Sequence, residues 1–349
     1  MKIALITDTH FGARGDHGAF DRFFKKFYEG IFFPVLERES IQRVVHLGDI
    51  FDRRKYINYL TLNNCREYFF DRINSLGIVL DIIVGNHDVF YKNTNEINSP
   101  SLLLKEYSTI NVYDDPTTVS IGGTDILYLP WITSDNYGRS IEEKNTTKAT
   151  LCFGHLELAG FQMYKGFVND HGFDSKMFER FDRVFTGHFH HRSSSGNITY
   201  LGNPYEITWS DYKDPRGFHI FDTETRELSF IENPYTIFHK IFLNKDYVQE
   251  DYSHLEDCFI KVVVQDRDQQ MKLDLLIDRL EKVNPADIQV VDDHLHKDIE
   301  DNNDILESAE DTLTILSKFC EQMDDTVDKK KLDSLIRNLY NEAINLESA

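Results

Sequence analysis

Polar side chains that can bind metal ions follow five separate apolar runs of this chain. They are Asp8 and His10 in "LITDTH", Asp49 in "VVHLGD", Asn86 and His87 in "IIVGNHD", His155 in "LCFGH", and His188 and His190 in "VFTGHFH". Residues i and i+2 of an extended segment share a face, so Asp8 can act with His10, and His188 with His190. One such residue after a glycine more often belongs to a turn. The joint pattern is what indicates a site.

These residue types favour a particular metal chemistry. Imidazole, carboxylate and amide groups without thiolate suit divalent ions such as Mn²⁺, Fe²⁺ or Zn²⁺. Apart from His87, seven ligands remain, which are too many for one tetrahedral ion but fit two ions that share the carboxylate of Asp49. Two ions roughly 3.5 to 4 Å apart activate water and stabilise a phosphoryl group during displacement. The residues therefore predict phosphoester hydrolysis.

The elements that must position these residues alternate along the chain. Strand-like runs carry the motifs, and helical patterns over about 17–39 and 58–75 lie between the first three. This alternation predicts βαβ units, in which the carboxyl ends of parallel strands meet at one edge of a sheet. Later strands follow with fewer helices. We therefore expect an α/β fold, a sandwich of mixed sheets covered by helices, with His46 as a core histidine.

The pattern changes in the last third of the chain. Three strand-like runs and the helical run "KLDLLIDRLEKVN" predict a small α+β module. Two amphipathic helices then follow, either as a docking element or as a hairpin folded back on its own domain. The expected domains are 1–235 with the motifs, 236–295 as a capping domain that binds DNA, and 296–349 as C-terminal helices.

Charge and cysteine content restrict the setting. The net charge is −21 over 349 residues, so long-range attraction to nucleic acid is excluded and any such binding must be local. Four widely spaced cysteines without a CxxC pair argue against a disulfide framework and favour a reducing cytoplasm. No apolar run approaches the roughly 18 to 20 residues that span a bilayer. We expect a cytoplasmic protein that does not contact membranes.

The motifs "DTH", "GDIFD", "GNHD", "GH" and "GHFH", in this order, resemble those of the calcineurin-like metallophosphoesterases. Within them, the final "GHFH" and the C-terminal layout are similar to the DNA double-strand-break repair nucleases. This branch includes the bacterial SbcD subunit, the meiotic recombination eleven nuclease and, most similar, the recombination endonuclease subunit of T-even phages. The resemblance covers about residues 1 to 230. It implies a four-layer fold with a small capping domain and a C-terminal helical hairpin.

The resemblance also implies roles for individual residues. Asp8, His10, Asp49 and His190 would hold one ion, and Asp49, Asn86, His155 and His188 the other. Mn²⁺ is the expected ion, with Mg²⁺, Fe²⁺ or Zn²⁺ as alternatives. His87 would protonate the leaving 3′ oxygen, and Asp88 would orient its imidazole. Some relatives carry a histidine where this chain has Asp52, which is expected to organise the loop instead.

Basic residues lie beside two of the motifs. Arg53, Arg54 and Lys55 follow the bridging aspartate, and Arg14 follows the first motif. They could contact DNA phosphates at the mouth of the site. The alternative is a solvated loop that pairs with nearby carboxylates.

Three functions remain open at this point. The first is a two-metal DNA nuclease, a 3′-to-5′ exonuclease on duplex DNA and an endonuclease on single strands, processing ends for recombination, repair and replication. The resemblance implies that it is a homodimer and works with an SbcC-type coiled-coil ABC ATPase that binds the C-terminal helices. The second is a phosphatase or small-molecule phosphodiesterase. The third is a scaffold without catalysis, although all seven ligands are present.

Overall fold

The computed structural model divides the chain into two compact units, which are described separately. The first comprises Met1–Ile207 and Lys213–Thr236, and the second Thr208–Tyr212 and Ile237–Ala349. The structure describes residues 1–164, 166–243, 251–264 and 270–292, with Lys329, Lys331, Leu332, Leu335 and Ile336.

The first unit is built on two six-stranded mixed sheets. In the first sheet, four neighbouring strands run parallel and two antiparallel strands extend its edge. Its order is β14 (Leu228–Glu232), β13 (Gly217–Asp222), β1 (Lys2–Ile6), β2 (Arg43–His46), β3 (Val79–Ile83) and β4 (Ile110–Tyr113). The parallel arrangement brings the carboxyl ends of β1, β2 and β3 to one edge.

The second sheet repeats this plan with four parallel strands at its centre. Its order is β11 (Ser193–Ser195), β12 (Ile198–Tyr200), β10 (Arg183–Gly187), β7 (Leu151–His155), β6 (Thr124–Leu129) and β5 (Thr117–Ile121). A hairpin of β8 (Gln162–Tyr164) and β9 (Phe167–Val168) stands apart. The β7 and β10 ends therefore also lie side by side.

Hydrophobic side chains from both sheets meet in a shared core. Ile3 and Leu5 of β1 pack with Phe153 and Phe185 of the other sheet. Alternate residues of a strand face opposite ways, so Ala4 and Ile6 are buried on the outer face instead. The long buried runs are what strands covered on both faces require.

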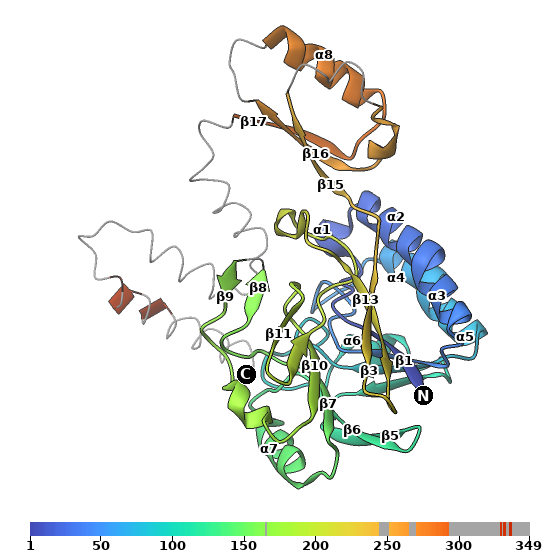
Figure 1. Cartoon of the computed structure of the whole chain (residues 1–349), viewed down its shortest axis with the longest axis vertical. Helices are drawn as coiled ribbons and strands as arrows, with labels where there is room; N and C mark the ends of the chain where they lie inside the picture. The colour runs from blue at the N-terminus through green and yellow to red at the C-terminus, as the bar shows by residue number, and fades with distance from the viewer. Residues whose placement is uncertain are drawn as a thin grey trace. The chain divides into compact units, whose positions relative to one another are not determined.

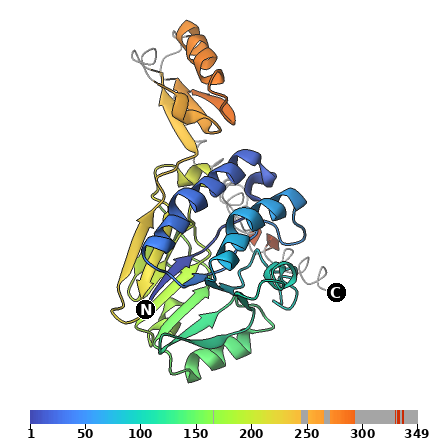
Figure 2. The same ribbon diagram turned by 90° about the vertical axis from the view of Figure 1, so that its right-hand side faces the viewer.

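Helices cover the outer faces of the sandwich. On the first sheet, helices α2 to α5 lie side by side (Figures 1 and 2) and bury an aromatic cluster that includes Phe27, Tyr28 and Phe69. On the second sheet, Phe178 and Phe181 pack against Cys152 and Val184. The helices are α1 (Ala13–Asp16), α2 (Gly18–Phe27), α3 (Phe33–Arg38), α4 (Tyr59–Cys65), α5 (Asp71–Ser75), α6 (Ser99–Leu103) and α7 (Tyr137–Thr146), with π-helical turns at Tyr28–Phe32 and Arg66–Phe70 and a 3₁₀ turn at Ser175–Phe178.

The second unit contains a three-stranded parallel sheet and a helix. The sheet order is β15 (Phe238–Phe242), β16 (Phe259–Val264) and β17 (Asp287–Asp292), joined by α8 (Gln270–Glu281), with 3₁₀ turns at Trp209–Asp211 and Ser253–Leu255. The Trp209 ring lies 4.7 Å from that of Phe238, with the Lys261 ammonium 4.3 Å from its face. The segment 208–212, which the sequence assigned to the first domain, therefore belongs to this unit.

The layered α/β fold expected from the sequence is confirmed. Both long helices and every strand that carries a motif form where the patterns predicted them. The elements that were not predicted are α1, β4, β5, α6, α7, β8, β9 and β11. The expected C-terminal helices at 296–349 lie outside the described residues, apart from five helical positions between Lys329 and Ile336.

Candidate metal centre

The structure brings the predicted ligands together beyond the carboxyl ends of β1, β2, β3, β7 and β10. Two groups form there, and within each the ligand atoms lie within 4.8 Å of one another. The first group is Asp8, His10 and His190, and the second is Asp49, His155 and His188. Residues up to 182 positions apart in the sequence thus meet at one place, as the strand-end pattern predicted.

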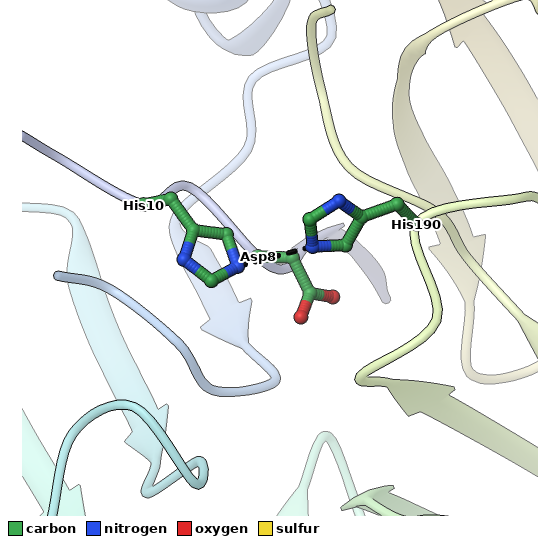
Figure 3. A group of neighbouring side chains, drawn as sticks. All are labelled: Asp8, His10 and His190. Atoms are coloured by element: carbon green, nitrogen blue, oxygen red, sulfur yellow. Dashed lines mark hydrogen bonds between the residues drawn. The ribbon is translucent and has the colours of Figure 1, made fainter. Parts of the chain in front are cut away.

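In the first group, two imidazoles face one another beside a carboxylate. His10 Nε2 lies 3.1 Å from His190 Nε2, next to the Asp8 carboxylate (Figure 3). Asp8 also accepts hydrogen bonds from the His188 backbone N–H at 3.1 Å and from Thr7 Oγ1 at 2.7 Å. Two converging ring nitrogens and a carboxylate provide lone pairs to one point, as a cation site requires.

In the second group, an amide oxygen lies between two imidazoles. Asn86 Oδ1 is 2.8 Å from His155 Nε2 and 2.9 Å from His188 Nδ1. His155 Nδ1 is 2.8 Å from the carbonyl oxygen of Leu47, which can only accept. The Nδ1–H therefore donates to this carbonyl, and in the neutral ring Nε2 keeps the lone pair that a metal needs.

Asp49 links the two groups. Its Oδ2 is fully buried, 3.2 Å from His155 Nε2 and 4.0 Å from His10 Nε2, and it has no hydrogen-bond partner among the described residues. Its other oxygen, Oδ1, accepts a 2.7 Å hydrogen bond from the backbone N–H of His87. A buried carboxylate oxygen without a hydrogen bond is costly, and cations on both sides would satisfy it.

Four of these residues have a backbone conformation that residues other than glycine rarely adopt. The φ angles are 53° at Asp8, 42° at His10, 57° at Asp49 and 90° at His188. Positive φ at residues with a Cβ is unfavourable and persists where the surrounding structure enforces it. The strands end in sharp turns here, which direct the side chains inward.

Two motif glycines provide the space for these side chains. A Cβ on Gly187 would lie 2.8 Å from Asp8 Oδ2, and one on Gly85 would lie 2.9 Å from the carboxyl carbon of Asp49. Real Cβ atoms do not approach that closely. The glycines beside the motifs are therefore required by packing against the carboxylates rather than by turn formation alone.

Burial and mutual charge shift the acid–base behaviour of the centre. Burial raises the pKa of Asp8 to about 6. For Asp49, burial would raise the pKa, but the nearby His155 outweighs it and holds the pKa well below its usual range. For His155, burial opposes the charge, yet the Asp49 carboxylate raises the pKa to about 9. In the absence of metal, the Asp49 carboxylate and the His155 ring thus form a buried ion pair with 3.2 Å between Oδ2 and Nε2, although the hydrogen bond of Nε2 is made with Asn86 Oδ1.

His87 lies beside the first group, with its ring centroid 4.8 Å from that of His10. Its Nδ1 is 2.6 Å from the carbonyl oxygen of Asp52, to which it must donate. The Asp52 carboxylate lies 3.6 Å from His10 Nδ1. Asp52 therefore contacts both imidazoles, one through its backbone and one through its side chain.

The role expected of Asp88 is corrected by its hydrogen bonds. Both carboxylate oxygens accept from backbone N–H groups, at 2.9 Å each, of Gly85, Asp49 and Ile50. Asp88 is fully buried, and burial raises its pKa to about 7. It fixes the turns that carry Asp49, while the carbonyl of Asp52 orients the His87 ring.

Other residues around the centre gave no metal-ligand signal in the sequence. The Trp131 ring, which follows β6, lies 5.1 Å from the His188 ring. Arg216 is buried and donates to the carbonyl oxygen of His190 and, at 2.8 Å, to Asp214 Oδ2. A strand-end position marks Trp131, whereas nothing local marks Arg216.

His46 is the core histidine that the sequence predicted. It is fully buried, and burial lowers its pKa to about 3. Its Nδ1 accepts from the Gly48 N–H at 3.2 Å, so its Nε2–H donates to Thr9 Oγ1 at 3.0 Å. The ring is neutral, and the hydrogen bonds of both its nitrogens are made with Thr9 and Gly48, outside the two ligand groups.

The four predicted DNA-binding residues differ in their surroundings. Arg53 forms a 2.7 Å ion pair with Asp16, as expected if this loop pairs with nearby carboxylates instead of DNA. Arg54 and Lys55 line a cavity of about 170 Å³, with the Lys55 ammonium 5.8 Å from the Phe90 ring centre. Arg14 is exposed in α1, with a φ angle of 54°.

Comparison with known proteins adds to this geometry. The family model for calcineurin-like phosphoesterases matches residues 1–192. The chain belongs to this family. It is 32% identical over 353 residues, 98% of this chain and 99% of the relative, to exonuclease subunit 1 of Enterobacteria phage T4. It is 24% identical over 231 residues, 57% of this chain and 59% of the relative, to the SbcD component of the SbcCD nuclease of Staphylococcus saprophyticus. A solved archaeal phosphodiesterase aligns over 67% of this chain and all of its own, with 16% identity and a TM-score of 0.34.

The family uses two divalent metal ions, and the two ligand groups match that number. The donor set also fits, because imidazole nitrogens and carboxylate and amide oxygens converge on a buried carboxylate oxygen that lacks a hydrogen bond within the described part of the chain. The two relatives are named as subunits of nuclease complexes. Among the described residues, no helix is long and apolar enough to span a bilayer.

Proposed function

We infer that this phosphoesterase is a metal-dependent DNA nuclease that hydrolyses phosphodiester bonds. The observation that carries this inference is the position of Asp49 Oδ2, which lies within reach of ring nitrogens from both ligand groups. A shared carboxylate is the arrangement that a two-metal phosphodiester hydrolase needs. The relationship to an exonuclease subunit over nearly the whole chain supports DNA as the substrate.

Asp49 would contact both ions, and the other ligands would be divided between them. Asp8, His10 and His190 would bind the first ion, and Asn86, His155 and His188 the second, with Mn²⁺ as the metal. Two bound ions supply positive charge that stabilises the phosphoryl oxygens and lowers the pKa of water. The residues themselves orient the site, since the Leu47 carbonyl fixes the His155 tautomer and the Asp88 carboxylate fixes the Asp49 turn.

We propose that His87 is the general acid. Its backbone N–H binds Asp49 Oδ1, which places it next to the shared carboxylate. Its Nδ1–H is held by the Asp52 carbonyl, so Nε2 is the atom that would give a proton to the leaving 3′ oxygen. Imidazole suits this step because its ordinary pKa lies near neutrality.

The test is cleavage by His87→Ala in the presence of Mn²⁺. Loss of a general acid is expected to slow hydrolysis of single-stranded DNA by at least about 100-fold, with two ions per chain still bound. His171→Ala is the matched control, since His171 is an exposed histidine that pairs with Asp170, and its activity should equal that of the wild type. Cleavage at the wild-type rate by His87→Ala, with full metal content, would remove the assigned acid.

The substrate class is tested separately. We expect turnover of end-labelled duplex from its 3′ ends and nicking of circular single strands, and far slower turnover of a phosphomonoester. A preference for the phosphomonoester or for a small cyclic phosphodiester would instead favour the phosphatase or phosphodiesterase alternative. Metal binding without turnover of any of these would favour a scaffold.

We also propose that the nuclease unit forms a homodimer. Tyr56, Ile97 and Leu102 are 64%, 42% and 60% exposed and line one cavity. Exposed apolar groups that are contiguous in this way often mark an interface. Leu102→Glu should convert a dimer to a monomer in analytical ultracentrifugation, and an unchanged mass for wild type and variant would contradict this surface.

A further partner is proposed from the relatives alone. One is named as part of SbcCD and the other as an exonuclease subunit, which supports an SbcC-type coiled-coil ATPase as the partner, bound through residues 296–349. Cys65, Cys152 and Cys258 form no disulfide, which supports a reducing compartment, the cytoplasm of the host if a phage encodes the chain. Deletion of 296–349 should abolish co-purification with the ATPase and leave Mn²⁺ binding intact.

A further inference from the structure

An open cleft of about 480 Å³ lies between the two sheets at the edge formed by β13 and β14 on one side and β11 and β12 on the other. His219 is paired with Leu5, and Thr199 with Phe185, so both side chains face the space between the sheets. Leu5 and Phe185 belong to the hydrophobic core between the sheets, whereas the edge beside them is polar. Its lining includes Arg183, Arg192, Arg226, Thr199, His219 and Phe230.

The three arginines of this cleft differ from several others that the structure describes. Arginines such as Arg43, Arg72 and Arg139 bind carboxylates. Within residues 1–164, 166–243, 251–264 and 270–292, no ion pair involves any of the three cleft arginines, and Glu227 is the one carboxylate that lines the cleft. This is unusual in a protein of net charge −21. Like charges that converge in this way favour an anionic ligand.

Buried polar atoms at the cleft also lack partners. His219 is 2% exposed, and its Nδ1 has no hydrogen-bond partner among the described residues. Arg226 Nη1 and Ser193 Oγ are also buried, and neither has a hydrogen-bond partner in the part of the chain that the structure describes. Native proteins satisfy nearly all such groups. Ser193, His219 and Arg226 all line the cleft, so a ligand bound there would lie close to polar groups that lack a partner among the described residues.

The neighbouring side chains are arranged to hold an oxyanion. The Arg192 guanidinium lies 4.0 Å from the Phe230 ring centre, so stacking fixes its plane and leaves its edge for hydrogen bonds. Burial lowers the pKa of His219 to about 3, so the ring is neutral and gives one N–H donor without adding charge. Guanidinium, hydroxyl and imidazole donors together are typical of phosphate binding.

We propose that this cleft is a second ligand site of the nuclease unit, which binds the phosphate group of a nucleotide or of a DNA strand. Its volume matches that of small-molecule sites and exceeds the needs of a free phosphate ion. Its far end is distant from the metal centre, because Arg183 begins β10 whereas His188 follows its end, about 16 Å further at roughly 3.3 Å per residue, while Arg192 at the other end follows the ligand His190 by two positions. The proposal does not depend on the catalytic function.

The experiment is isothermal titration of the full chain in EDTA and low salt, so that the metal centre does not contribute. The ligands are inorganic phosphate, deoxyadenosine monophosphate and a ten-nucleotide oligothymidine. We expect binding of at least one, weakened tenfold or more in Arg183→Gln/Arg226→Gln. Arg38→Gln is the matched control for loss of positive charge, since Arg38 is an exposed arginine on α3, and it should change the affinity less than twofold.

A second variant tests the buried imidazole. His219→Phe keeps a ring of similar size beside Phe230 but removes the hydrogen-bond donor, and binding should weaken several-fold while the thermal unfolding temperature is retained. Tighter binding of the mononucleotide than of the oligonucleotide would identify a free nucleotide as the ligand, and the reverse would identify a DNA strand. Absence of binding of all three ligands, or equal binding by wild type and both variants, would overturn the proposal.

Discussion

The two ligand groups of the metal centre are held in place by different parts of the chain. In the first group, side chains make most of these contacts: Thr7 binds Asp8, Asp52 lies beside His10, and Arg216 binds the backbone of His190, in addition to the His188 backbone N–H that binds Asp8. In the second group, backbone groups contact the ligand side chains, since the Leu47 carbonyl binds His155 and the His87 N–H binds Asp49 Oδ1. Substitutions can therefore weaken the first group selectively, whereas the second changes mainly when a ligand itself is replaced.

The largest effect is expected where the two groups meet. Asp49→Asn removes the negative charge that both ions would share, so the affinity for both ions should fall more than about 100-fold. Replacing a residue that only hydrogen-bonds a metal ligand typically costs less than this. Inductively coupled plasma mass spectrometry should find fewer than one ion per chain. Retention of two ions would mean that the groups bind metal independently of Asp49.

The groups should also differ in their dependence on pH. His155 carries a proton at pH 7 in the metal-free protein, because its pKa is raised to about 9, and this proton must leave before Nε2 binds a metal. Mn²⁺ affinity of the second group should therefore rise about tenfold per pH unit from pH 7 to about 9. In the first group, Asp8 has a pKa of about 6 and is already ionised above that pH. The Mn²⁺ affinity of the first group should therefore stop rising at a lower pH than that of the second.

The stability of the metal-free protein should also depend on pH through His155. A histidine whose pKa is raised by folding stabilises the folded state below its ordinary value of 6.5, and this contribution is lost as the pH rises through about 9. Thermal unfolding in EDTA should show the decline, and saturating Mn²⁺ should remove it. A flat profile in EDTA would contradict the Asp49–His155 ion pair.

A smaller effect is expected from the side chains that hold the first group. Asp52→Asn keeps the carbonyl that binds His87 but removes the carboxylate beside His10. Outer partners of this kind contribute about 10- to 100-fold to affinity, so one of two Mn²⁺ binding steps should weaken by tens-fold and the other remain. Equal weakening of both steps in a calorimetric titration would show that the groups are not separable.

The smallest effect is expected from Thr7→Val. Valine keeps the shape of the buried side chain and removes the hydroxyl that donates to Asp8. One hydrogen bond of about 1 kcal/mol corresponds to roughly a fivefold loss of affinity in the first group. Thr9→Val is the control, since Thr9 binds His46 and the Ile50 carbonyl instead, and its metal affinity should not change.

The sequence predicted that these residues come together because their signal is local. Each of Asp8, Asn86 and His155 stands directly after an apolar run, and the carboxyl ends of parallel strands necessarily meet. The patterns that predicted both long helices are equally local. In contrast, the short strand β4 and helix α7 have weak patterns and depend on tertiary packing.

The outer contacts could not be predicted, since they depend on backbone direction. The motif places Asp88 next to His87, but the turn directs its carboxylate toward three amides instead of the imidazole. A carbonyl such as that of Asp52 is present at every residue and gives no signal. Arg216 binds the His190 carbonyl from 26 positions away in the sequence, which no local pattern reveals.

The central claim is that two cations share the carboxylate of Asp49, and anomalous X-ray scattering from crystals grown with Mn²⁺ tests it most directly. The account predicts two anomalous peaks on either side of Asp49 Oδ2, one beside His10 and His190 and the other beside His155 and His188. A single peak, or two peaks of which neither contacts Asp49, would contradict it.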